Sequence, residues 1–125
     1  MAGETADALR DALEKLSEDL DTLINSMPEG PDKVALEQVQ DKLENAAGDV
    51  DALSMETLLT NNADLQTIKD LTTKINANSS AIASSVANVK KITGIGDAAA
   101  NLDTAVKAGN VGGIVSAAAS LKAAL

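Results

Sequence analysis

The chain contains no cysteine, no histidine and no aromatic residue. Without cysteine it can form neither disulfides nor thiolate metal sites. Without histidine it lacks the side chain most often used as a general base near neutral pH. The titratable side chains that remain are carboxylates, lysines and a single arginine, so acid–base catalysis would require a deeply buried group with a strongly shifted pKa. We therefore predict a protein that is not an enzyme and that holds no cofactor and no metal.

The missing aromatic side chains also limit the core, because they bury the largest area per residue. The hydrophobic fraction of 45% consists only of Ala, Val, Ile, Leu and Met. A chain of 125 residues is the usual size of one domain, and we expect residues 1–125 to form one. An Ala-rich core predicts modest stability for a monomer, which self-association would increase by burying more apolar surface.

Acidic residues are scarce in the last 55 positions and greatly outnumber basic ones before them. Residues 1–70 hold 17 of the 19 acids but 5 of the 10 bases, whereas residues 71–125 hold 2 acids and 5 bases. The acidic part should repel nucleic acid and anionic membranes. It is interpreted either as a solvated face that keeps the protein in solution or as one side of an attraction between opposite halves.

No targeting or membrane-spanning segment is apparent. Four acidic residues lie within the first fifteen positions, where a signal peptide would have a basic and an apolar region. The longest uncharged stretches, 75–89 and 108–121, are rich in Ser and Asn or in Gly and are too short to cross a bilayer. We expect a soluble protein without a transmembrane segment, cytoplasmic by default, although the compartment stays open.

Apolar residues recur at alternating spacings of four and three, which predicts amphipathic helices. The first stripe predicts a helix over 4–27, ended by Pro28 and Pro31. A second stripe predicts a helix over 32–53. A third, capped by Asn61, predicts one long helix over 62–93, with Thr72 and Ser79 inside its apolar stripe. The residues predicted to pack in the core are Leu9, Leu13, Leu16, Leu20, Leu23, Leu36, Val39, Leu43, Ile68, Ile75, Ile82 and Val86.

Glycines divide the last third of the sequence. Gly94 and Gly96 are predicted to end the long helix, and Asp97 to cap a short helix over 97–108. Gly109 would end that helix, and Asn110 would cap another over 111–124. The predicted fold is therefore all-α, an antiparallel helical bundle of three long amphipathic helices plus a C-terminal short helical hairpin. The sequence leaves open whether the hairpin closes the core or forms a docking surface.

The segment Ile92-Thr93-Gly94-Ile95-Gly96, followed by Ala100 and Leu102, resembles the helix-hairpin-helix motif of non-specific DNA-binding proteins. The resemblance covers residues 92–102. It implies a corner at which the amides of Gly94 and Gly96 contact phosphates, with Lys90 and Lys91 adding charge. Asp97 and the net charge of −9 oppose such binding, so we interpret the segment as a tight turn between helices. The Gly-x-Gly-x-x-Ala pattern at 94–99 lacks the preceding strand of a dinucleotide site.

Carboxylates cluster at Glu18, Asp19 and Asp21, and again at Asp49 and Asp51. Neither cluster has the loop of a calcium site, and both are interpreted as solvated helix faces. The sequence therefore predicts a non-enzymatic structural or protein-interaction module, with self-association as one form of the interaction. Two alternatives stay open: a carrier of a lipid or other apolar ligand between helices, and weak nucleic-acid binding through the segment 92–102. The partner and the oligomeric state are not predicted.

Overall fold

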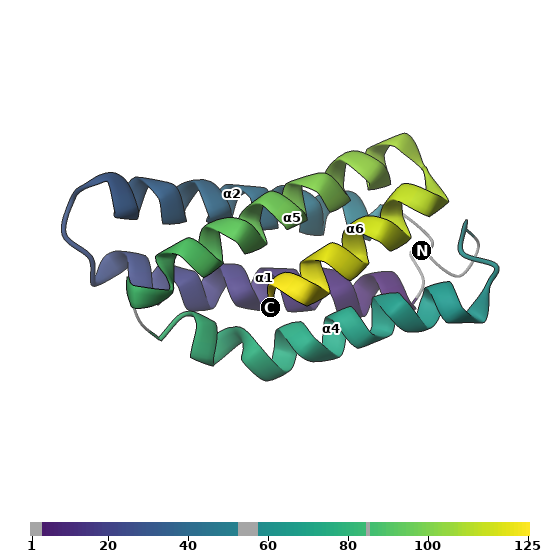
Figure 1. Cartoon of the computed structure of the whole chain (residues 1–125), viewed down its shortest axis with the longest axis horizontal. Coiled ribbons are helices and arrows are strands. Elements are labelled where there is room, and N and C mark those ends of the chain that lie inside the picture. The colour runs from purple at the N-terminus through teal and green to yellow at the C-terminus, as the bar shows by residue number, and fades with distance from the viewer. Residues whose placement is uncertain (1–3, 53–57, 85) are drawn as a thin grey trace.

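The computed structural model describes residues 4–52, 58–84 and 86–125, with the side chain of Val86 left out. Within these ranges all regular structure is helical, as predicted (Figure 1). The helices are α1 (Glu4–Asn25), α2 (Pro31–Asp51), α4 (Asn62–Ile82), the short 3₁₀ helix η1 (Val86–Asn88), α5 (Val89–Ala108) and α6 (Val111–Ala124). The predicted end of the second helix at residue 53 lies outside the described residues.

Several helix ends follow the predicted local chemistry. The side chain of Asn61 accepts a hydrogen bond from the amide of Ala63 at 2.8 Å and begins α4. The side chain of Asn110 accepts one from the amide of Gly113 at 3.0 Å and begins α6. Gly109 ends α5 with a φ of 65°, a left-handed conformation that glycine adopts without steric cost.

The predicted single helix over 62–93 is wrong, because the chain turns between α4 and α5. The side-chain amide of Asn88 donates to the carbonyl oxygens of Ala81 and Ile82, at 3.3 and 3.0 Å. The hydroxyl of Ser84 donates to the same Ala81 oxygen at 2.6 Å. Polar side chains thus satisfy carbonyls at the end of α4 that another helical turn would otherwise satisfy.

The predicted break at Gly94 and Gly96 is also wrong, since both glycines lie inside α5, which has 20 residues. Asp97 is not a helix cap; its carboxylate pairs with Lys42 of α2 at 3.0 Å. In the part of the chain that the structure describes, the bundle therefore has four helices of 20 to 22 residues and a final helix of 14, rather than three long helices and a short hairpin.

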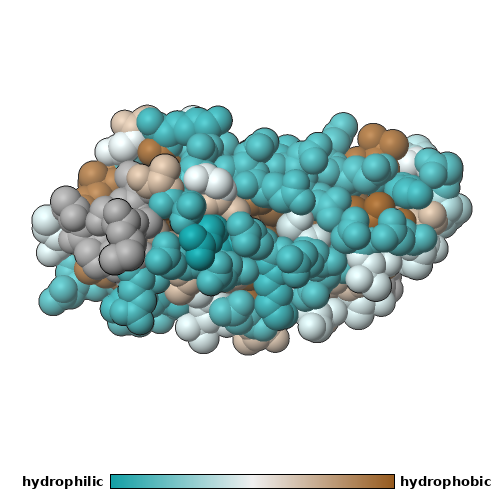
Figure 2. Space-filling model, turned by 180° about the vertical axis from the view of Figure 1, so that it is seen from behind, coloured by the Kyte–Doolittle hydropathy of each residue, from teal (hydrophilic) through white to brown (hydrophobic). Residues whose placement is uncertain are grey.

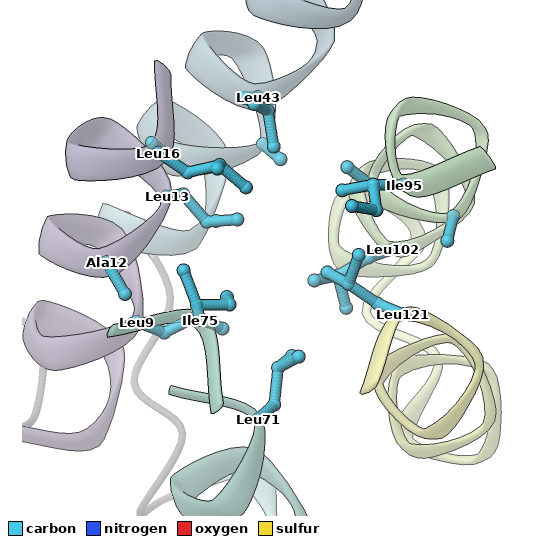
Figure 3. Close-up of a cluster of buried hydrophobic side chains, with 14 of the residues drawn as sticks. Leu9, Ala12, Leu13, Leu16, Leu43, Leu71, Ile75, Ile95, Leu102 and Leu121 are labelled. Carbon is cyan, nitrogen blue, oxygen red and sulfur yellow. The ribbon is translucent and has the colours of Figure 1, made fainter. Parts of the chain in front are cut away.

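The helices pack as a bundle that closes on itself. Helix α1 packs against α2 and α4, α2 also against α5, and α5 also against α6. The last helix completes the circuit, because α6 packs against α4 as well as α5. Figure 1 shows α6 between these two helices, and Figure 3 shows side chains from α1, α2, α4, α5 and α6 directed into one interior.

The core contains the residues that the apolar stripes predict. Eleven of the twelve predicted packing residues are buried, and the twelfth, Val86, lies outside the described side chains. Thr72 and Ser79 are buried as their place in the third stripe indicates. The Thr72 hydroxyl donates to the carbonyl oxygen of Ile68 at 3.1 Å, and the Ser79 hydroxyl donates to the Asp19 carboxylate of α1. Both buried hydroxyls are therefore satisfied.

Few large apolar side chains reach the surface of the described residues. Val34 on α2 is the one large hydrophobic residue among them that is mainly exposed, with 51% of its surface accessible. On the face seen in Figure 2, hydrophobic atoms form small patches separated by hydrophilic ones. Within the described ranges, none of the helices combines the length and the apolar character needed to span a membrane.

Candidate functional site

The four residues of the predicted contact corner lie on one continuous helix. Lys90, Lys91 and Gly94 are exposed on α5, whereas Gly96 is buried. A Cβ atom added to Gly96 would lie 2.7 Å from a methyl carbon of Val39 on α2. Gly96 therefore permits a close approach of two helix backbones, and it does not form a turn.

The predicted hairpin amides are consequently not available at this position. Amide groups inside an α-helix donate to the carbonyl four residues earlier, and Gly94 is the sixth residue of α5. Lys90 and Lys91 keep their exposed charges, but no hairpin lies beside them to provide phosphate contacts. Nucleic-acid binding by residues 92–102 remains an untested prediction.

An acidic groove lies on the outer side of the bundle between α1 and α2. We define it by Glu14, Glu18 and Glu44, which line a surface hollow of about 280 Å³ together with Ser17. The Ser17 hydroxyl donates to the Glu44 carboxylate at 3.1 Å. Among the described residues, no lysine or arginine lines this hollow.

A side-chain amide extends the polar surface next to the acidic groove. Gln40 of α2 donates to the carbonyl oxygen of Ser17 at 2.9 Å and to the Asp21 carboxylate at 3.3 Å. These bonds cross from α2 to α1 and fix the relative position of the two helices. The carboxylates of the groove therefore come from two helices that these hydrogen bonds connect.

The basic residues of α1 and α2 pair elsewhere. Lys42 binds Asp97 on α5 at 3.0 Å, and Lys15 binds Asp19 at 3.3 Å along α1. Arg10 binds Asp11 at 2.9 Å and also contacts Asp51 of α2. The carboxylates of Asp11 and Asp51 raise the pKa of the Arg10 guanidinium above its ordinary value. None of the ion pairs between described residues involves Glu14, Glu18 or Glu44 of the acidic groove.

A second cluster of charged residues lies where the end of α2 meets α5. The ammonium group of Lys107 lies 3.4 Å from the Asp103 carboxylate and 3.7 Å from that of Asp49. The Asp103 side chain is 13% exposed, and its Oδ1 atom is buried without a hydrogen-bond donor from the described residues. Burial raises the pKa of the Asp103 carboxyl, and the nearby Asp49 carboxylate raises it further, while Lys107 acts in the opposite direction.

An open groove of about 510 Å³ lies at the surface between α1 and α4. Its lining is mixed in character, with Ala8 and Leu65 beside threonines, Glu4 and Lys69. It lies at the surface, whereas the space between the long helices is filled by side chains such as Leu71, Leu102 and Leu121 (Figure 3). Binding of an apolar ligand remains an untested prediction.

The carboxylate clusters noted in the sequence are only partly the ones that the fold brings together. Within the described ranges, no group of three or more acidic side chains is placed to hold a metal ion. Glu18 does belong to the acidic groove, but its partner Glu44 was not predicted, because the pairing joins two helices. Asp103 was also missed, although its spacing of four from Lys107 is a helical ion-pair signal.

Comparisons with protein families, with curated proteins and with solved structures found no match to this chain.

Proposed function

We propose that the protein is a non-enzymatic interaction module that presents the acidic outer side of α1 and α2 to a basic protein partner. Residues 4–51, which include both helices, contain 14 acidic and 4 basic residues, whereas residues 52–125 contain 5 acidic and 6 basic residues. The segment that forms one layer of the bundle thus carries a charge of −10, which exceeds the net charge of −9 of the whole chain. The electrostatic field of such a charged surface speeds the encounter with a partner of opposite charge and disfavours partners of like charge.

The observation that carries this proposal is the acidic groove of Glu14, Glu18 and Glu44. Like charges one helical turn apart, such as those of Glu14 and Glu18, destabilise a helix by some tenths of a kcal/mol. The bases on the same two helices are engaged at other positions. Natural sequences keep locally unfavourable features, such as a pair of like charges one turn apart, mainly at functional sites. This supports a role for these carboxylates in binding.

A different protein is a better candidate for the partner than a second copy of the chain. Two acidic α1–α2 layers would repel each other, and the apolar stripes already face one interior. The predicted self-association through those stripes would require the bundle to open. We therefore propose a partner with a lysine- or arginine-rich surface, bound in a manner that salt weakens.

The triple variant E14Q/E18Q/E44Q tests the proposal, because it removes three charges and keeps the shapes of the side chains. Partners captured by the wild-type protein at low salt should be recovered at least about tenfold less, which corresponds to a loss of about 1.4 kcal/mol. The variant should also unfold at a slightly higher temperature, since repulsion is relieved. Cross-linking capture and circular dichroism measure these two effects.

The matched control is E4Q/D32N/D64N, which removes the same number of charges from the first turns of three helices. It should keep its partners and lose a little stability, because acidic residues favour helix N-termini. The proposal fails if both variants lose their partners equally, or if neutralising the acidic groove leaves capture unchanged.

A further inference from the structure

The contact between α2 and α5 includes two carboxylates that meet with one shared cation. Asp49 and Asp103 both lie next to the ammonium group of Lys107, at 3.7 and 3.4 Å. Two negative charges therefore lie around a single positive one. Lys107 itself is largely exposed, with 62% of its side chain accessible, so water weakens its attraction for both carboxylates.

One oxygen of this cluster lacks a donor. Oδ1 of Asp103 is buried and accepts no hydrogen bond from the residues described, while the Asp49 carboxylate pairs with the same Lys107 ammonium group, near enough to raise the pKa of Asp103. Two ionised carboxylates are both acceptors and cannot bond to each other. A single proton bound by one of them would turn that carboxyl into a donor.

The other charged groups near this interface are engaged elsewhere. On α2, Lys42 pairs with Asp97 of α5 at a different point of the same interface. Helix α6 also packs against α5, and its one charged residue, Lys122, pairs with Asp70 on α4 at 3.7 Å. Helix α1 packs against α2, and its Arg10 pairs with Asp11 and Asp51. Among the described residues, Lys107 is therefore the cation that pairs with the two carboxylates, and a proton is the simplest way to balance the second charge.

We propose that Asp49 and Asp103 bind one shared proton and form an acid-strengthened clasp between α2 and α5. As the pH falls, the clasp takes up its proton and the two helices are held by a carboxyl–carboxylate hydrogen bond in addition to Lys107. As the pH rises, the proton is lost and the interface is left with two like charges. The clasp regulates how firmly α5, and with it α6, is held on the bundle.

The direction of the pH effect follows from the raised pKa of Asp103. Between the ordinary aspartate pKa of about 3.9 and the higher folded value, the folded state binds more protons than the unfolded state. Stability from this group is therefore fully present below about pH 3.9 and is lost as the pH rises through the folded pKa. The chain carries a net charge of −9, so repulsion among its other carboxylates also makes stability depend on pH. The experiment must therefore distinguish the effect of the clasp from this general effect.

Carboxyl-carbon NMR titration of the wild type and of Asp49→Asn tests the clasp directly. In the wild type the Asp103 carboxyl should titrate above the ordinary value, and in Asp49→Asn its pKa should fall because the second carboxylate is gone. A second measurement follows the melting temperature with pH in about 0.5 M salt, which screens exposed charges. Asp103→Asn should melt a few degrees above the wild type at neutral pH, and the difference should vanish at about pH 3.5, below the ordinary pKa.

Asp97→Asn is the matched control, because it removes one carboxylate from the same helix but leaves the clasp intact. Its melting temperature should not rise above that of the wild type at neutral pH. The proposal is overturned if Asp103 titrates at the ordinary value, if Asp49→Asn leaves that pKa unchanged, or if Asp103→Asn and Asp97→Asn respond alike.

Discussion

Gly96→Leu is expected to lower the free energy of unfolding by about 3 kcal/mol, at the upper end of the usual cost of inserting methyl groups into a packed interior. Even the first added carbon would lie 2.7 and 3.1 Å from the two methyl carbons of Val39, and 3.2 Å from its Cβ. Val39 cannot move away easily, since its β-branched side chain has one strongly preferred rotamer in a helix. The backbones of α2 and α5 would have to separate.

Gly94→Leu is the matched control, two residues earlier on the same helix. An added Cβ at Gly94 meets nothing within 4 Å. In a helix interior, leucine is more favourable than glycine by about 0.8 kcal/mol. This variant should therefore be slightly more stable than the wild type. Chemical denaturation followed by circular dichroism measures both. If the two glycines formed a turn instead, both substitutions would destabilise the protein, and that result would contradict a continuous α5.

Leu121→Ala should lower the free energy of unfolding by as much as Gly96→Leu or more, because α6 closes the bundle through few large side chains. Leu121 is fully buried and faces the interior close to Leu102 (Figure 3). Truncating a buried leucine to alanine costs about 2–5 kcal/mol. We expect a loss of about 3–4 kcal/mol here, within that range, since the flanking buried residues Ala117 and Ala118 are too small to fill the cavity.

Ser120→Ala is the control for Leu121→Ala. Ser120 is exposed on α6, and surface substitutions usually change stability by less than about 0.5 kcal/mol. A loss below about 1 kcal/mol for Leu121→Ala, measured by the same denaturation experiment, would mean that α6 does not seal the core. The magnitude matters because small domains are stable by only about 5–15 kcal/mol.

The sequence predicts the helices well where local chemistry is decisive. The first two stripes identify the buried leucines of α1 and α2, because an alternating spacing of three and four keeps side chains on one helix face. Asn61 and Asn110 begin α4 and α6, as expected. Each of these features depends on a few adjacent residues, and no distant contact is needed to interpret it.

The predictions fail where a residue has two roles that only the fold separates. Glycine both interrupts helices and permits close helix contacts, and at Gly96 the contact with Val39 decides the outcome. The true turn before α5 contains no glycine or proline. Asn88 and Ser84 provide its side-chain hydrogen bonds, and residues of these two types also occur within helices. The apolar stripe continues through this turn in the sequence, which makes two helices resemble one.

The candidate sites show the same limit. The excess of acids in the first half is evident from the sequence, but the adjacency of Glu18 and Glu44 depends on how α1 and α2 are paired. The clasp likewise joins Asp49 and Asp103, whose proximity depends on the packing of α5 against α2. The composition thus predicts that the surface of the first half is negatively charged, whereas the fold determines which carboxylates lie next to each other.

The central claim is that one chain closes its own core through α6 and meets its partner through charged surface. Molar mass from light scattering over a concentration series, with refractive-index detection because the chain lacks Trp and Tyr, tests it most directly. The account predicts a mass near 12.7 kDa, that of one chain, at every concentration. A stable dimer or larger assembly, or a mass that rises with concentration, would contradict it and would mean that copies of the chain complete one another.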